Sequence, residues 1–280
     1  MADAGLNLIS PATFAGFPPA RPLDSHKGSF GHLAIVAGSF GFHGAAVLAA
    51  RAAQRARPGL ITLLTTDEVY HAVASQLQSV MVDVWKMELK FPPKTTAILI
   101  GPGLASPDMT DELKAIVRKL WRDSTLPLIV DASALDWLSS HSLPNDLLRV
   151  ITPHPGEAAR MLNTTTPLVQ ADRPAALREL SRRFGGCWVV LKGHHTLIGR
   201  SEGEIFMNPS GNPYLAQGGS GDVLAGFIGG LLAQPDLQAD AGKTIRYAVW
   251  QHGAAADKLQ TSRSNWIVED LVVKIGGVPA

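Results

Sequence analysis

The chain has 280 residues, of which 46% are hydrophobic and 18% charged, and its formal net charge at pH 7 is +1. A chain of this length and composition can bury the core of an ordinary α/β domain. It contains no basic run that would favour nucleic acid or a membrane surface as a partner. No apolar run reaches the roughly 18 residues of a membrane-spanning helix.

The N-terminus and the cysteine content indicate the compartment. The first ten residues, MADAGLNLIS, lack the charged and apolar regions of a secretory signal. The single cysteine, Cys187, excludes an internal disulfide and begins the apolar run CWVVL, so we expect it in the core. Together these features predict a soluble cytoplasmic protein.

The chain begins with an irregular segment and a βαβ unit. Residues 1–30 are rich in Pro, Gly and Ser without a clear period, which predicts an irregular lead-in. A buried strand at 32–37 then runs into the glycine turn 38–44, a helix at 45–57 and a second strand at 60–65. A glycine turn after the first strand of such a unit faces the ligand side of the sheet.

Strands and helices alternate over the rest of the chain. We expect strands at 97–100, 126–130, 150–152 and 187–191, a hairpin formed by 196–198 and 204–207, and helices at 111–121, up to 162, 172–184, 240–258 and 268–275. No linker or internal repeat interrupts this alternation. The pattern predicts one α/β domain over 1–280, with a mainly parallel sheet, helices on both faces and a site at the carboxyl ends of the strands.

The stretch from Asn208 to Gly230, NPSGNPYLAQGGSGDVLAGFIGG, carries the strongest chemical signal. Its glycine turn opens into an apolar helix, so unpaired N–H groups would gather at the positive end of that helix and bind an anion. Asp222 would repel phosphate, but as a base it would draw a proton from a hydroxyl held beside a phosphoryl group. Taken alone, the motif fits equally well a plain turn with Asp222 as a helix cap.

Three further loops follow predicted strands and are candidates for ligand contacts. They are GPGL at 101–104, TPHPGE at 152–157 and KGHHT at 192–196. Lys192 just past a buried strand, beside Gly and Thr, suits a phosphate or nucleotide loop. Adjacent His194 and His195 have no partner at metal-ligand spacing and are expected to be loop residues. Glu157 would lie in the first turn of the helix that ends at about 162.

The ordered set GSFGFHGAA, GPGL, TPHPGE, KGHHT and NPSGNPYLAQGGSGD resembles the ribokinase-like NAD(P)H-hydrate dehydratases. These enzymes repair hydrated NADH and NADPH at the expense of a nucleoside di- or triphosphate. The resemblance runs from about residue 27 to the last helix. The family pattern DADALN reads DASALD here, so Ser133 and Asp136 are given no role.

The resemblance implies a role for each matching residue. Asp222 would be the catalytic base and would also contact the hydrated dinucleotide. The remaining hydrate contacts would be Ala45, Gly103 and His154, and the adenine-nucleotide contacts would be Lys192, Gly193, His194, His195, Thr196 and Gly221. Glu157 would help hold Mg²⁺ through water. A side chain larger than the native one at Gly103 or Ala45 would be expected to occupy ligand space.

The resemblance also implies the reaction and the partners. The S-form of hydrated NADH or NADPH would be converted back to the reduced dinucleotide through a phosphorylated hydrate. ADP would be the donor, giving AMP and phosphate, with ATP as the other possibility. Family members commonly form homotetramers, and aromatics such as Trp250 or Trp266 would suit an interface if they are exposed, although a place in the core is equally expected. No epimerase domain precedes residue 27, so a separate hydrate epimerase would be the working partner.

Three other functions stay open. A ribokinase-like kinase for a vitamin precursor or sugar would share Asp222 and the glycine turn. A dinucleotide-binding oxidoreductase would use Gly38–Gly44 and Asp67, although the spacing G-x-x-G-x-x-G departs from the fingerprint G-x-G-x-x-G. A nucleotide-sensing module would keep the fold and bind without turnover.

Overall fold

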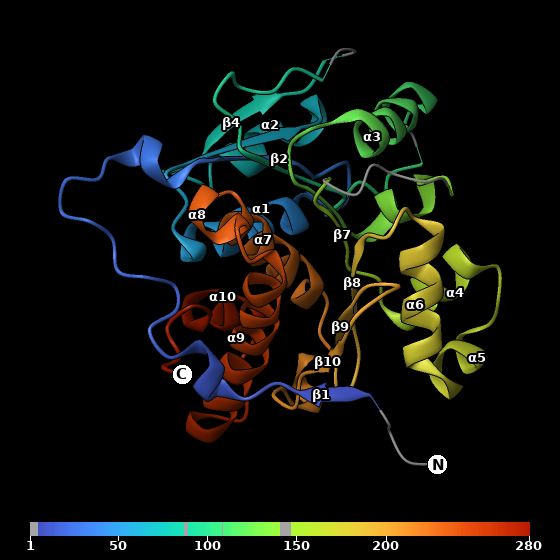
Figure 1. The fold of residues 1–280 in the computed structure, drawn as a ribbon. Coiled ribbons are helices and arrows are strands. Elements are labelled where there is room, and N and C mark those ends of the chain that lie inside the picture. Colours follow the sequence, from blue (N-terminus) through green and yellow to red (C-terminus); the bar gives the residue numbers. More distant parts are fainter. Residues whose placement is uncertain (1–4, 87–88, 108, 141–146) are drawn as a thin grey trace.

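The computed structural model describes residues 5–86, 89–107, 109–140 and 147–280 (Figure 1). Within these residues one ten-stranded sheet has the order β1-β10-β9-β8-β7-β6-β5-β2-β3-β4. Neighbouring strands are parallel except where β9 pairs with β8 and with β10. The strands are β1 (Leu6–Leu8), β2 (His32–Val36), β3 (Leu60–Thr65), β4 (Met81–Val84), β5 (Ala97–Ile100), β6 (Leu128–Val130), β7 (Arg149–Ile151), β8 (Trp188–Leu191), β9 (Leu197–Gly199) and β10 (Ile205–Met207).

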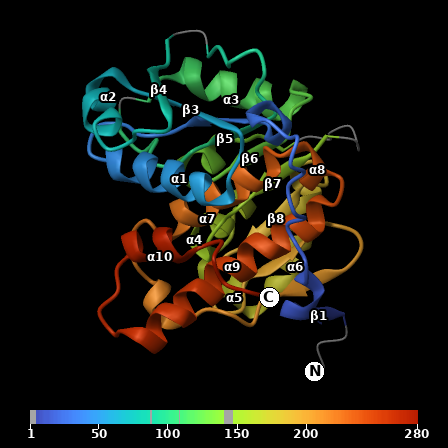
Figure 2. The ribbon, with the colours of Figure 1, turned by 90° about the vertical axis from the view of Figure 1, so that its left-hand side faces the viewer.

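Helices cover both faces of this sheet (Figures 1 and 2). The helices are α1 (His43–Ala56), α2 (Asp67–Ala74), α3 (Asp111–Asp123), α4 (Pro155–Leu162), α5 (Thr166–Ala171), α6 (Arg173–Arg183), α7 (Ser220–Leu232), α8 (Pro235–Gln238), α9 (Ala241–Ser262) and α10 (Val268–Lys274). The alternation of side chains along each strand divides the core in two. Leu33 and Ile35 pack with α1, α7, α9 and α10, whereas Ala34 and Val36 pack with α3, α4 and α6.

The strand order reverses direction beside β2. From β2 the chain moves to β3 and β4 on one side, and then returns to β5 on the other side. The loops after β2 and β5 therefore meet at the carboxyl edge of the sheet, where the Gly38 amide donates to Pro102 O (2.9 Å) and Ser39 Oγ donates to Gly103 O (2.7 Å). Such a switch point is where doubly wound sheets bind ligands.

Helices α1 and α7 pack side by side and run in the same direction. A Cβ added at Gly226 would lie 2.1 Å from Ala49 O, and one added at Gly230 would lie 2.6 Å from Ala53 O. Only glycine permits such a close backbone approach. Because the paired positions increase together along both helices, their N-termini lie at the same edge of the sheet, beside the switch point.

The fold class expected from the sequence is confirmed, with local corrections. The lead-in at 1–30 is not wholly irregular, since β1 extends the sheet beside β10 and Phe14 is buried in the core. Helices α2, α5 and α8 and strand β4 were not anticipated. Trp250 and Trp266 are each only 3% exposed, so the suggestion that they form an interface is wrong. Among the described residues, no helix combines the length and apolar character needed to cross a membrane.

Candidate active site

A lysine and two carboxylates meet at the carboxyl ends of β6, β7 and β8. Lys192 Nζ lies 2.9 Å from Asp131 Oδ1 and 3.7 Å from Glu157 Oε2. Thr152 Oγ1 donates to the same Asp131 oxygen at 2.6 Å. The grouping follows from the topology, because adjacent parallel strands deliver the residues that follow them to one edge of the sheet.

The Lys192 ammonium remains charged in this cluster. Burial alone would lower its pKa, but the neighbouring carboxylates of Asp131 and Glu157 outweigh burial, and the pKa of Lys192 is raised. Its side chain is 17% exposed, while those of Asp131 and Glu157 are 2% and 8% exposed. The cluster thus brings one fixed cation and two fixed anions to the base of the site.

The glycine turn and the first turn of α7 complete this centre. Gly219 precedes the helix with a left-handed φ of 93°, a conformation that favours glycine. The position of a Cβ on Gly221 would lie 3.2 Å from Lys192 Nζ, so the ammonium sits against this first turn. Asp222 follows at once, and its carboxylate is influenced by Lys192, Asp131 and Glu157.

The environment of Asp222 suits a base that works near neutral pH. Burial and the neighbouring Asp131 carboxylate raise the pKa of Asp222 to about 7, although Lys192 acts in the opposite direction. A carboxylate with this pKa is ionised at slightly alkaline pH and still basic enough to accept a proton. The alternative that Asp222 is the helix cap is wrong, because Gly219 is the N-cap residue of α7 and no side chain within the described part of the chain caps this helix.

His154 and Glu157 close the N-terminus of α4 together. His154 Nδ1 accepts hydrogen bonds from the amides of Gly156 (3.0 Å) and Glu157 (3.3 Å), and Glu157 Oε2 accepts from the His154 amide (2.7 Å). Burial lowers the pKa of His154 despite the opposing carboxylate of Glu157. With Nδ1 engaged as an acceptor in the neutral ring, the proton lies on Nε2, which is 3.5 Å from Glu157 Oε1.

A cavity of about 660 Å³ opens beside this centre. It is lined by every residue that the sequence assigned to the nucleotide, together with one assigned to the hydrate: Lys192, Gly193, His194, His195, Thr196, Gly221 and His154. The segment from Asn208 to Gln217 supplies much of the remaining lining. A cavity of this size suits a nucleotide-sized ligand.

Two side chains of α9 shape this cavity and were not anticipated. Asp257 accepts hydrogen bonds from the Gly211 amide (2.8 Å) and Asn212 Nδ2 (3.0 Å), which fixes the NPSGNP loop. His252 Nε2 lies 3.0 Å from Ser220 O, and burial lowers the pKa of this histidine to about 4. A neutral His252 can therefore donate from Nε2 to Ser220 O and stabilise the first turn of α7.

Ala45 and Gly103 lie at the switch point, outside the lining of that cavity. They adjoin each other, since a Cβ on Gly103 would be 3.0 Å from Ala45 Cβ. Gly226 of α7 packs against Ala49 of α1. Asp222 lies one turn before Gly226, and Ala45 lies one turn before Ala49. Because the two helices are parallel, Ala45 and Asp222 lie at the same level. Asp222 therefore lies beside Ala45, and Gly221, the residue before it, lines the cavity.

The expected effect of enlarging Gly103 needs correction. Gly103 has a φ of 67°, and its Cβ would lie 2.5 Å from Phe42 O. A side chain there would strain the loop against α1 before it reached any ligand. Gly103 therefore allows the two switch-point loops to approach, and its contact with a ligand would be made by the backbone.

Asp131 is the central residue that sequence reasoning missed. Asp131 is the first residue of the segment DASALD, in which Ser133 and Asp136 depart from the family pattern and were given no role. The structure separates these positions, because Asp131 is buried under Lys192 whereas Asp136 accepts from Arg160 Nη2 (3.0 Å) at the surface. The signal that identifies Asp131 is an acidic residue directly after a buried parallel strand.

The donor set fits a magnesium ion that is held largely by water and phosphate. Among the described residues, no group of three or more His, Cys, Asp or Glu side chains is arranged to hold a metal ion directly. Mg²⁺ keeps several waters and typically takes only one or two carboxylates beside substrate phosphates. Glu157, next to Lys192 and Asp222, can serve as such a water-linked carboxylate.

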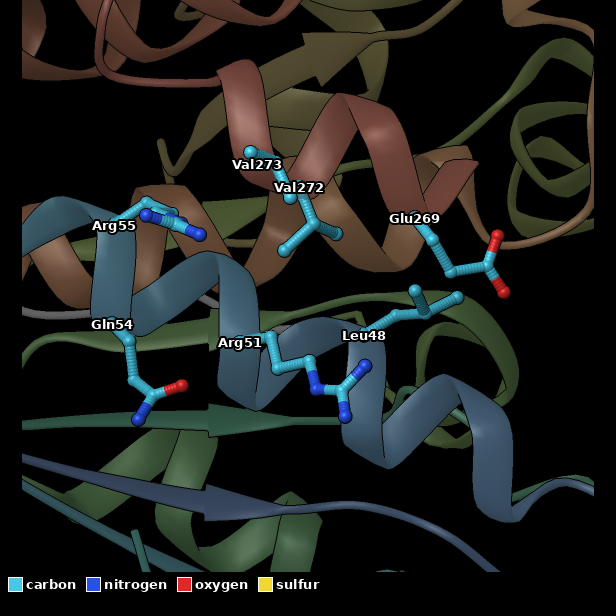
Figure 3. Close-up of a pocket in the computed structure, with 7 residues that line it drawn as sticks. All are labelled: Leu48, Arg51, Gln54, Arg55, Glu269, Val272 and Val273. Carbon is cyan, nitrogen blue, oxygen red and sulfur yellow. The ribbon is translucent and has the colours of Figure 1, made fainter. Parts of the chain in front are cut away.

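A second hollow of about 430 Å³ lies between α1 and α10 (Figure 3). Its lining combines apolar and polar side chains, namely Leu48, Arg51, Gln54, Arg55, Glu269, Val272 and Val273. Figure 3 shows that Leu48 and Val272 lie between the two helices, whereas Gln54 points away from α10. None of the predicted site residues lines it, so the candidate site stays at the carboxyl edge of the sheet.

Comparison with known proteins agrees with this geometry. The sequence profile described as NAD(P)H-hydrate dehydratase matches residues 33–275. A Neisseria meningitidis protein named ADP-dependent (S)-NAD(P)H-hydrate dehydratase is 41% identical over 251 residues, which cover 87% of this chain and 82% of that protein. The chain belongs to the NAD(P)H-hydrate dehydratase family.

Other members of the NAD(P)H-hydrate dehydratase family differ in length. A bifunctional NAD(P)H-hydrate repair enzyme from Coxiella burnetii is 38% identical over 244 residues, and the match covers 86% of this chain but 48% of that enzyme. The chain thus spans about half the length of this bifunctional relative.

Solved structures support the same family and its ribokinase-like fold. The Bacillus subtilis ADP/ATP-dependent NAD(P)H-hydrate dehydratase, co-crystallised with ATP and Mg²⁺, superimposes with a TM-score of 0.85, 29% identity and 96% coverage of each chain. An Arabidopsis thaliana ribokinase gives a TM-score of 0.56 at 11% identity, with 89% of this chain and 99% of that chain covered. The ribokinase match supports the fold alone.

Proposed function

We propose that this chain is an ADP-dependent (S)-NAD(P)H-hydrate dehydratase, a carbon–oxygen lyase that repairs hydrated NADH and NADPH. The observation that carries the proposal is the position of Asp222. Asp222 lies level with Ala45 through the α1–α7 packing and directly follows Gly221, which lines the cavity with Lys192–Thr196, and burial raises the pKa of its carboxyl to about 7. A base between two ligand sites is what phosphoryl transfer to a hydroxyl requires.

Each set of residues would hold one reactant. The adenine nucleotide would occupy the 660 Å³ cavity, against the loop from Lys192 through Gly193, His194 and His195 to Thr196, with its phosphates at Gly221. The hydrated dinucleotide would lie at the switch point against Ala45 and Gly103. His154, on the cavity wall, would contact the hydrate. These assignments combine the family resemblance with the two-sided arrangement around Asp222.

The reaction proceeds in two balanced steps. Asp222 accepts the proton of the ring hydroxyl, whose oxygen attacks the terminal phosphorus of ADP and displaces AMP. The nitrogen lone pair of the reduced ring then expels phosphate, and loss of the adjacent proton restores the ring double bond. The sum is hydrate plus ADP giving NADH or NADPH, AMP, phosphate and one proton, which leaves to solvent. The protein supplies positioning and fixed charge for the in-line transfer.

Lys192 and the first turn of α7 provide most of that fixed charge. The ammonium, held by Asp131, faces Gly221, where unpaired helix N–H groups favour phosphoryl oxygens. Mg²⁺, linked through water to Glu157, would neutralise charge on the nucleotide phosphates. Asp131 keeps Lys192 in place and is thereby a positioning residue for the donor.

The finer features of the proposal rest on relatives and composition. ADP is chosen as donor because the Neisseria relative is named ADP-dependent, while the Bacillus enzyme is named for both ADP and ATP. The bifunctional repair enzymes among the relatives suggest that a hydrate epimerase works with this chain. The single buried, free Cys187 suits a reducing compartment, which supports a cytoplasmic location. We further propose a homotetramer, on the family resemblance.

One mixture tests the function against its alternatives. NADH hydrate, ADP or ATP, Mg²⁺ and the protein are combined, and absorbance of reduced nicotinamide and release of phosphate are followed. Recovery of the absorbance with stoichiometric phosphate release supports the dehydratase. A stable phosphorylated product would instead indicate the ribokinase-like kinase, hydride exchange an oxidoreductase, and tight binding without turnover a sensing module. The family relatives favour none of these three.

A further inference from the structure

Arg173, the first residue of α6, reaches the backbone of the Lys192–Thr196 loop. Its guanidinium donates to Leu191 O (2.9 Å), Lys192 O (3.3 Å) and His195 O (3.2 Å), and also to His194 O. Asp172, the residue before Arg173, caps α6 by accepting from the Ala175 amide at 3.0 Å. One side chain thus binds four carbonyls of a single loop.

These bonds divide the polar groups of the loop into two sets. The carbonyls from Leu191 to His195 all have donors, since Thr196 Oγ1 donates to the remaining one, Gly193 O, at 3.1 Å. By contrast, within the part of the chain that the structure describes, the amides of Gly193, His194 and His195 have no hydrogen-bond acceptor. All three residues line the 660 Å³ cavity.

A run of unpaired amides beside a cavity attracts an anion. The loop adopts this arrangement only with strained or uncommon backbone angles, since His195 has a φ of 54° and Gly193 a φ of 134°. The four guanidinium bonds offset that cost, because charge-assisted hydrogen bonds are stronger than neutral ones. The Nε of Arg173 is buried without a hydrogen-bond partner among the described residues. Burying an unpaired N–H costs free energy, so the bonds that the other guanidinium nitrogens make to the loop have to offset this cost.

We propose that Arg173 is a positioning residue for nucleotide binding: by holding the carbonyls of residues 191–195, it turns their amides toward the phosphates of ADP or ATP. This inference deepens the proposed function and rests on it for the identity of the ligand. Arg173 itself does not line the cavity. It acts through the loop, so its removal weakens nucleotide binding without removing a ligand contact.

The same helix offers a matched control. Arg178 donates to Ser201 O (3.0 Å), Arg200 O (3.3 Å) and Gly203 O (3.0 Å), and so holds the β9–β10 hairpin as Arg173 holds the nucleotide loop. Neither Arg178 nor its acceptors line the cavity. Arg178→Ala therefore removes the same kind of bond from the same helix, away from the ligand.

The test is ADP binding by calorimetry, together with turnover at saturating ADP, for wild type and variants. Arg173→Ala should raise the Kd for ADP about tenfold or more, the factor for one lost charge-assisted bond, and change kcat less than twofold. Arg178→Ala should leave both constants unchanged. Arg173→Lys should restore only part of the affinity, because an ammonium cannot bind four carbonyls in a fork.

Several results would overturn the inference. These are an unchanged Kd for ADP in Arg173→Ala, an equal rise of Kd in Arg178→Ala, or full affinity in Arg173→Lys. If Arg173→Ala does not fold, the affinity of Arg173→Lys provides the test instead. Wild type that binds neither ADP nor ATP would overturn it as well. Wild type that binds ADP but leaves the hydrate unchanged would instead refute the proposed function, and the Arg173 comparison would still stand on binding.

Discussion

Replacing Asp222 with Asn separates the role of a base from a purely structural role in the first turn of α7. Asn has nearly the same size and leaves the N-cap residue Gly219 unchanged, but it cannot accept the proton of the hydrate hydroxyl. Turnover should therefore fall by roughly 10²–10⁴, the usual contribution of a general base. If Asp222 has only a structural role, the Asn variant keeps full activity.

The structure also predicts that this inactive variant is the more stable protein. The pKa of Asp222 is raised from 3.8 to about 7, first by burial and then by Asp131. A shift of about three pK units corresponds to an upper limit of about 4 kcal/mol, and access of water to this half-buried side chain reduces the expected value to about 1–3 kcal/mol. Asn has no charge to bury and escapes this cost.

The sign of the effect depends on pH. The folded state binds the Asp222 proton more tightly than the unfolded state does, so wild-type stability falls as pH rises from about 4 to about 7. Above that range the full cost is present. The stability gain of Asp222→Asn should therefore be largest at pH 8 and should shrink as the pH is lowered to 5.

Urea unfolding of both proteins at pH 5 and pH 8, with turnover measured on the same samples, provides the assay. Wild-type turnover should rise with pH through about 7, as the carboxyl ionises. An Asn variant that is less stable than wild type at pH 8, or whose stability difference does not change with pH, would refute the electrostatic argument. Full turnover in that variant would refute the assignment of the base.

Four further variants or measurements test the remaining assignments. Lys192→Ala should weaken ADP binding by about 1–3 kcal/mol in calorimetry, because a charge-assisted contact is lost; unchanged affinity would remove Lys192 from the site. Ala45→Val should raise the KM for the hydrate with little change in ADP binding, whereas Gly103→Val should lower the melting temperature as well, because its side chain meets Phe42. Glu157→Gln should raise the Mg²⁺ concentration needed for half-maximal turnover, and an unchanged requirement would contradict its metal role. Light scattering at micromolar protein should give the mass of a tetramer, and a monomer would reject that proposal.

The alternation of apolar strands and capped helices was sufficient to predict the fold class. The strands at 60–65 and 97–100 were placed within their actual bounds because each is a buried run with a clear turn after it. Strand β1 could not be anticipated, since its three residues, two half-buried and one exposed, show no period of their own and pair with the open edge of β10. Short elements of this kind are determined by tertiary contacts.

The structure brings together candidate residues at which residue type and local motif coincide. Asp222 follows a glycine turn, His154 follows a proline and Lys192 follows a buried strand, and all three lie at one edge of the sheet. Asp131 and Arg173 were missed for a physical reason. Their contributions arise from contacts 61 and about 20 residues away in the sequence, which spacing rules do not register.

The close packing of α1 and α7 has a mechanical consequence. With Gly226 against Ala49 and Gly230 against Ala53, neither helix can slide or tilt without a backbone clash. The helix start that bears the base and the helix start beside the hydrate loop therefore form one stiff block. Any closure around the proposed reactants would therefore have to come from the outer loops, because the packing keeps Asp222 and Ala45 at a fixed spacing.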